Sequence, residues 1–167
     1  LFVRMEPGEY REASFLDDRI IDARTQGAWI AVAQVQGALA GLPMQRPVHF
    51  IFHAGHVGST LLSRLLDESA EAFGLREPLP LRTLAEAHDM LDMPYSLLSR
   101  DGFDELAGIM MRLWSRAPAG CGAAVVKATS STARMGRYLL STHAQSRALH
   151  VNLRAEPYLA AILAGAN

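Results

Sequence analysis

Several features that would define a function at once are scarce in this sequence. Its 167 residues include one cysteine, Cys121, which excludes an internal disulfide and a cysteine-rich metal site and leaves a small buried residue as the simplest interpretation. Lys and Arg number 16 against 17 Asp and Glu, so the chain as a whole has no positive field to hold DNA or RNA by its phosphates. We therefore expect no nucleic-acid partner, and any anion site has to be local.

Long hydrophobic runs are missing as well. The longest apolar stretch, 28–44, is interrupted by Gln34, Gln36 and Pro43 and is shorter than the roughly 20 residues that a membrane span needs. We expect no membrane span, and no secretory signal is visible at the start. With the single cysteine, this favours a cytoplasmic protein. The ends, at Leu1 and in an Ala-rich run at Asn167, suggest an incomplete chain.

What is present is the composition of a globular protein. Half of the residues are hydrophobic and 20% are charged, which suits a domain with a substantial core. Residues 1–46 are expected to form a helical accessory segment, with one or two helices between 11 and 42 that end near Gly41 and Pro43. Residues 47–167 are expected to form the main domain.

Within 47–167, short β-branched runs alternate with helical patterns. This order predicts an α/β fold of the P-loop type, with three α/β/α layers around a central, mostly parallel sheet. Ligands of such sheets bind at the carboxyl ends of the strands. The expected strands are 47–53, 72–76, 122–127 and 147–153, and the expected helices are 59–66, 82–92, 103–116, 131–142 and one that starts after Arg154.

The loop after the first expected strand has the composition of a phosphate cradle. Gly55 and Gly58 permit backbone angles that let successive N–H groups turn inward, and Ser59 and Thr60 add hydroxyl donors at the start of a helix. The nucleotide-hydrolase pattern is not met, because His53 stands at its first Gly and Ser59 at its Lys. An ordinary strand-to-helix turn is the alternative.

The stretch Gly55-His56-Val57-Gly58-Ser59-Thr60 resembles the loop of the P-loop sulfotransferases, roughly P-[KR]-[SG]-G-T-T before a Leu-rich helix. The resemblance implies that residues 55–60 bind 3′-phosphoadenosine 5′-phosphosulfate. His56 occupies the position of the family's Lys or Arg, which binds the 5′-phosphate and assists departure of the leaving group. A loop histidine bonded to backbone is the alternative.

The same resemblance extends to Glu77, nineteen residues after Gly58, at a distance similar to that of the catalytic carboxylate base in the tyrosylprotein branch. A carboxylate there can accept the proton of an attacking hydroxyl. The alternatives are a solvated loop carboxylate or a helix-dipole partner. Lys127 lies in a stretch similar to the family's K-x-P run. The alternative is that Lys127 is a solvent-exposed charge at the end of a strand.

The last part of the resemblance concerns the 3′-phosphate. Arg154 matches the family's arginine that grips this phosphate, whereas a surface ion pair with Glu156 is its alternative. The family's serine eight residues beyond that arginine is replaced by Ile162, and Ser130 or Ser131 from a neighbouring loop is the expected substitute.

Together these residues predict an enzyme that transfers a sulfuryl group from 3′-phosphoadenosine 5′-phosphosulfate to a small-molecule or peptide acceptor, at a hydroxyl or an amine. Glu77 and His56 are the expected catalytic residues. A P-loop small-molecule kinase and a non-catalytic binding domain are the alternatives, and the oligomeric state is not indicated. No metal site is expected, because metal-ligand spacing is missing among His49, His88, His143 and His150.

Overall fold

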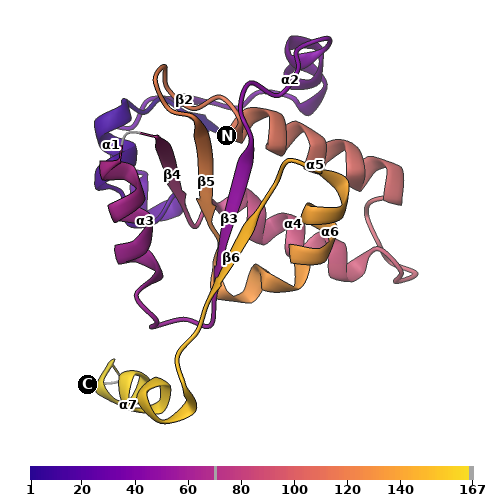
Figure 1. Ribbon diagram of the computed structural model, residues 1–167. Coiled ribbons are helices and arrows are strands. Elements are labelled where there is room, and N and C mark those ends of the chain that lie inside the picture. Colours follow the sequence, from indigo (N-terminus) through magenta and orange to yellow (C-terminus); the bar gives the residue numbers. More distant parts are fainter. Residues whose placement is uncertain (70, 166–167) are drawn as a thin grey trace.

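The computed structural model describes residues 1–69 and 71–165, and its centre is a parallel four-stranded sheet. The strands lie in the order β4-β5-β3-β6, and all three neighbouring pairs are parallel (Figure 1). Their bounds are β3 Val48–His53, β4 Ala72–Arg76, β5 Ala123–Lys127 and β6 Ala148–Val151. The predicted α/β class, with a parallel sheet flanked by helices, is confirmed.

Helices cover the sheet on both faces (Figure 1). One face packs Phe50, Phe52 and Val126 against the helices that follow β4 and β5, and the other packs Ile51 and Val125 against the helix that follows β3. The alternation follows from the two-residue period of a strand. These helices are α3 Ser59–Glu68, α4 Leu79–Met90, α5 Arg100–Trp114, the 3₁₀ helix η2 Ser130–Met135 and α6 Gly136–Thr142, and α7 Ala155–Gly165 comes last.

The strand order creates a switch point between β3 and β5. After β3 the chain crosses one face through α3 to reach the edge strand β4, and after β5 it crosses the other face through η2 and α6 to reach β6. The connections from these two neighbours therefore leave to opposite faces, which opens a crevice at their carboxyl ends. That edge carries residues 54–58 and the segment after Lys127.

Helix positions differ from expectation mainly at the termini. The helices predicted at 82–92 and 103–116 begin about one turn earlier, because Pro80 is tolerated in the first turn of α4 and Ser99 caps α5 by accepting a hydrogen bond from the Gly102 amide at 3.1 Å. The single helix predicted at 131–142 is divided into η2 and α6.

The N-terminal segment is less helical than predicted. It holds a two-stranded antiparallel sheet, a short 3₁₀ helix and two short helices, so helix within 11–42 is confirmed mainly for 32–39. Its apolar positions lack a single helical period, and Trp29, for example, is 85% exposed. The bounds are β1 Phe2–Val3, α1 Pro7–Glu12, η1 Asp18–Ile20, β2 Gly27–Ala28 and α2 Val32–Leu39.

This segment is nevertheless tied to the main sheet. The Leu16 amide donates to the carbonyl of Arg76 at 2.7 Å, and the carbonyl of Leu16 accepts from the Leu79 amide at 2.9 Å. Residues 13–19 therefore run along the carboxyl end of β4. In the part of the chain that the structure describes, no helix combines the length and apolarity needed to cross a membrane.

Candidate functional site

The loop between β3 and α3 has the backbone of an anion cradle. Gly55, His56 and Gly58 all adopt left-handed conformations, with φ of 89°, 50° and 79°. Turn conformations of this kind can point successive amides toward one site. Helix α3 then begins at Ser59 without a side-chain cap, which leaves its first amides available to an anion.

Within residues 1–69 and 71–165, two residues other than glycine have left-handed backbone: His56 and Glu77. Such a conformation costs about 1–2 kcal/mol for a residue with a Cβ. Strained residues of this kind gather at functional sites, where the surrounding structure holds them in place. Both residues are the ones that the sequence proposed as catalytic.

Glu77 follows β4 directly and turns into a buried cluster of charged and polar groups. The Lys127 ammonium, with 2% of its side chain exposed, forms an ion pair with Glu77 Oε1. The Glu77 amide also donates to the Lys127 carbonyl at 2.7 Å. Lys127 is therefore a buried partner of Glu77 rather than a solvated charge, and Glu77, 14% exposed, is not a solvated loop carboxylate.

His53 joins this cluster to the loop. It is the last residue of β3 and lies on the same face of the sheet as Ile51 and Lys127. Its Nδ1 accepts a hydrogen bond from the Gly55 amide at 2.9 Å, and its Nε2 lies 4.0 Å from Glu77 Oε1. Burial, and next the positive charge of Lys127, lower the pKa of His53 below its ordinary value.

The neighbouring segments approach the loop as well. A methyl group built on Gly55 would lie 4.0 Å from Cβ of Ser130, so the start of η2 borders the cradle. From α7, the Tyr158 hydroxyl donates to the carbonyl of Ala54 at 2.9 Å. Figure 1 shows α7 beyond the end of the sheet where these loops meet.

Arg154 is exposed just before α7, and within the described residues it forms no hydrogen bond or ion pair with the loop. Its carbonyl accepts the Tyr158 amide at 3.0 Å, but its guanidinium makes no ion pair in the described parts of the chain, including with Glu156. The predicted role of Arg154 therefore remains a prediction. The remaining predicted residues lie in or beside the same loop. Val57 is part of the loop, and Ser59 and Thr60 form the first turn of α3.

Two features of this edge were missed from sequence. His53 was predicted at the end of the first strand but was given no role, although its place two residues after Ile51 puts it on the same strand face. A buried pair between Asp67 of α3 and Arg76 of β4, at 2.5 Å, was not foreseen at all. Pairing across nine residues of chain has no local sequence signal.

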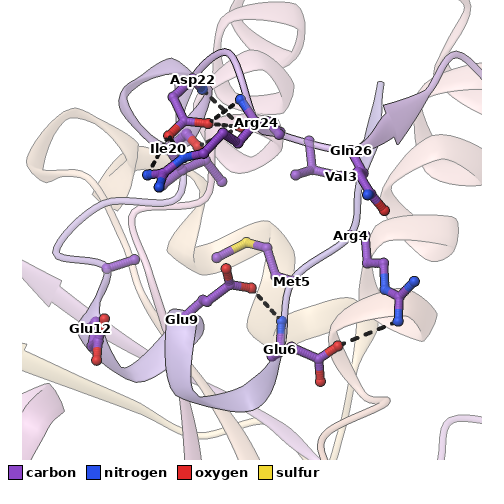
Figure 2. Close-up of a pocket in the computed structure, with 12 residues that line it drawn as sticks. Val3, Arg4, Met5, Glu6, Glu9, Glu12, Ile20, Asp22, Arg24 and Gln26 are labelled. Carbon is purple, nitrogen blue, oxygen red and sulfur yellow. Dashed lines mark hydrogen bonds and ion pairs between the residues drawn. The ribbon is translucent and has the colours of Figure 1, made fainter.

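A separate hollow of ≈ 770 Å³ lies in the N-terminal segment, between α1 and the residues around β2 (Figure 2). Three of its four carboxylates, those of Glu6, Glu9 and Asp22, are engaged by neighbouring groups. Glu9 accepts the Glu6 amide at 2.6 Å, and Asp22 pairs with Arg24 at 3.2 Å. This hollow shares no residue with the cradle, and its chemistry does not single out a ligand.

Comparison with known proteins adds no further assignment. A scan against protein-family models and a search of curated proteins returned no match to this chain.

Proposed function

We propose that the chain binds 3′-phosphoadenosine 5′-phosphosulfate and transfers its sulfuryl group to an acceptor. The observation that carries this proposal is the left-handed series Gly55, His56 and Gly58 ahead of an uncapped helix, joined through His53 to the buried carboxylate of Glu77. A loop suited to an anion and a carboxylate suited to act as a base thus lie at one edge of the sheet.

The residues present fit the donor nucleotide at its 5′ end. The backbone amides of residues 56–60 and the His56 side chain, which is exposed, are suited to its phosphosulfate, while the Gly55 amide is bound to His53 and Gly55 supplies the turn. Ser130 borders the same loop and offers a hydroxyl. Arg154 is the proposed contact to the 3′-phosphate, on the strength of the sequence resemblance.

Transfer between two oxygens requires mainly positioning and stabilisation of spreading negative charge. In the proposed reaction a bond forms between the acceptor atom and sulfur while the bond from sulfur to the 5′-phosphate oxygen breaks. The electron pair of the broken bond leaves with that oxygen, which yields adenosine 3′,5′-bisphosphate. The proton of the acceptor passes to the carboxylate of Glu77.

An ATP-dependent reaction is less well supported by this arrangement. A P-loop kinase uses a loop lysine against the phosphates. Here Ser59 stands at that position, and the nearby Lys127 is occupied by Glu77.

Thermal shifts with two nucleotides separate the possible functions. Adenosine 3′,5′-bisphosphate is expected to raise the melting temperature, whereas ATP with Mg²⁺ is not. The reverse result supports a kinase, and no shift with either supports a non-catalytic domain. The His56→Ala variant is expected to lose the response to adenosine 3′,5′-bisphosphate, and an unchanged response would remove His56 from the site.

A further inference from the structure

A second pocket, of ≈ 510 Å³, lies where the N-terminal segment meets the end of α5. Its walls come from residues 2–10, from Phe73 and Leu75 of β4, and from residues 113–118. It shares no lining residue with the loop between β3 and α3, with Glu77 or with Lys127. Small-molecule sites commonly have volumes of about 300–1,000 Å³. This pocket is therefore large enough for a small ligand and is separate from the proposed sulfuryl-transfer site.

The wall that α1 contributes is held in place by contacts within the protein. The Tyr10 ring packs edge-on against Phe73, with ring centroids 5.3 Å apart. The carbonyl of Tyr10 also accepts a hydrogen bond from the buried guanidinium of Arg76 at 2.6 Å. The opposing apolar side chains of Phe73, Leu75 and Trp114 are at most 8% exposed. A ligand that enters such a preformed pocket orders few protein groups, which lowers the entropic cost of binding.

The lining is apolar except for three side chains that carry hydrogen-bond donors. Tyr10, Trp114 and Arg116 supply a hydroxyl, an indole N–H and a guanidinium. None of these three groups forms a hydrogen bond or an ion pair within residues 1–69 and 71–165. Burial raises the pKa of Tyr10, which keeps its hydroxyl protonated near neutral pH. The lining side chains therefore offer donors that lack matching acceptors.

Arg116 is the charged member of this lining, and Asp and Glu are missing among the lining residues that the structure describes. Its Nη2 is enclosed without a hydrogen-bond partner, so a ligand cannot reach that atom, whereas Nε and Nη1 keep accessible surface. A guanidinium partly withdrawn from water without a counter-charge is unfavourable. Because its charge is delocalised over the whole group, an anion that contacts Nε or Nη1 also offsets the lost hydration of Nη2.

The position of Arg116 in the chain explains only part of this arrangement. Arg116 lies two residues beyond Trp114, the last residue of α5, where the negative end of the helix dipole favours a cation. Its guanidinium, however, forms no hydrogen bond to the last carbonyls of α5, and it lines an apolar pocket instead. The helix end accounts for a positive charge here but not for its place in the pocket wall.

The ligand that matches these walls has an apolar body and a single anionic head. An ionised carboxylate only accepts hydrogen bonds and carries one negative charge, which suits the free donors and the one guanidinium. A neutral alcohol supplies no counter-charge, and a cationic amphiphile is repelled. We propose that this pocket binds an amphipathic carboxylate of the medium-chain fatty acid type, with its head at Arg116 and its chain against Phe73, Leu75 and Trp114. The proposal does not depend on the proposed function.

Nitrogen-15 NMR of the indole N–H groups tests the location, because the chain has two Trp residues. Trp114 lines the pocket, whereas Trp29 lies outside it and is 85% exposed. The Trp29→Phe variant assigns the two resonances. Sodium decanoate, added to the wild type below its micelle-forming concentration, is expected to shift the Trp114 resonance and to leave that of Trp29 in place. An unmoved Trp114 resonance, or a larger shift at Trp29, would overturn the proposal.

Calorimetry of the wild type with ten-carbon probes tests the ligand class. Decanoate is expected to bind about tenfold or more tightly than decanol, because the alcohol lacks the charge that pairs with the guanidinium. Decyltrimethylammonium should bind more weakly than decanol, and acetate, which has no apolar body, should show no measurable binding. Equal affinities for decanoate and decanol, or tighter binding of the cation, would reject a carboxylate as the head group.

The Arg116→Met variant removes the charge and keeps most of the apolar length of the side chain. Its affinity for decanoate is expected to fall about tenfold, whereas its affinity for decanol should stay within about twofold. Arg112→Met is the control, since Arg112 lies in the last turn of α5 but outside the lining. Equal losses in both variants, or an unchanged decanoate affinity in Arg116→Met, would contradict the role of Arg116. Melting temperatures without ligand check that both variants fold, and the comparison of probes in the wild type decides the head group even where a variant does not.

Discussion

Two cations lie opposite each other on neighbouring strands, and the molecule neutralises them in different ways. Arg76 of β4 is in register with Lys127 of β5, and like charges at directly opposed positions are unfavourable. Arg76, with 0% of its side chain exposed, pairs with Asp67. Its guanidinium also donates hydrogen bonds to three backbone carbonyls in α1 and just after that helix. These carbonyls belong to Tyr10, Arg11 and Ala13. Lys127 is paired with Glu77, beside the unsatisfied Nε2 of His53.

The difference separates a structural ion pair from a candidate site. Every nitrogen of the Arg76 guanidinium has a partner, and Asp67 also accepts the Gly74 amide at 2.5 Å, so this pair joins α3, β4 and α1. The second cluster has left-handed backbone at Glu77 and a buried donor without a partner in the described residues. Strain and unmet hydrogen bonds are the features expected where a ligand completes the structure.

The largest expected effect is on the structural pair. Asp67→Ala leaves the Arg76 guanidinium buried without a counter-charge, so the free energy of unfolding should fall by about 3–5 kcal/mol in urea denaturation. Asp92→Ala is the control, because Asp92 and Arg100 form an exposed pair whose loss should cost under about 1 kcal/mol. Similar losses in both variants would contradict the structural role of Asp67.

Glu77→Gln should cost less, about 2 kcal/mol, because the Glu77 side chain is partly exposed at 14%. The loss arises from the buried Lys127 ammonium, so adding Lys127→Met should recover most of the stability. Sulfuryl transfer should stay absent in the double variant, since the proposed base is gone. If the double variant is no more stable than Glu77→Gln, the two charges are not coupled as described.

Gly58→Ala tests the cradle without a steric clash. The added methyl meets no atom within 4 Å, but φ of 79° is unfavourable for alanine, so a loss of about 1–2 kcal/mol is expected. Gly108→Ala in α5 also meets no atom and should instead stabilise by about 0.5–1 kcal/mol. A stabilising effect at Gly58 would show that the loop is not held in the left-handed conformation.

The pH dependence of stability is expected to show the smallest effect. Because burial lowers the pKa of His53 in the folded state, the unfolded chain binds more protons once the pH falls below the ordinary histidine pKa of about 6.5. Stability should therefore decrease from pH 7 toward pH 5. The groups acting on His53 are Lys127, Glu77, His150 and the Ala128 carbonyl.

His53→Gln should reduce this slope without removing it, since burial also lowers the pKa values of His49 and His143. Urea unfolding of both proteins at several pH values provides the measurement. An identical slope in the variant would show that His53 does not titrate with folding.

Sequence alone predicted the four strands of the parallel sheet, because each is a short apolar run bounded by Gly, Pro or polar residues, and it placed Gly55, Glu77 and Lys127 at or just after strand ends. The N-terminal segment was predicted poorly, since its apolar positions follow no single period and many, such as Trp29, stay exposed. Left-handed backbone at His56 and Glu77 could not be predicted, because it is imposed by tertiary contacts at residues that disfavour it.

The central claim is that residues 55–60 bind a phosphate group at the start of α3. Titration of adenosine 3′,5′-bisphosphate followed by amide NMR tests it most directly. We expect the largest shifts on the amides from Gly55 to Thr60. Binding that leaves these amides unmoved while it shifts another region, or the absence of binding at millimolar nucleotide, would contradict it.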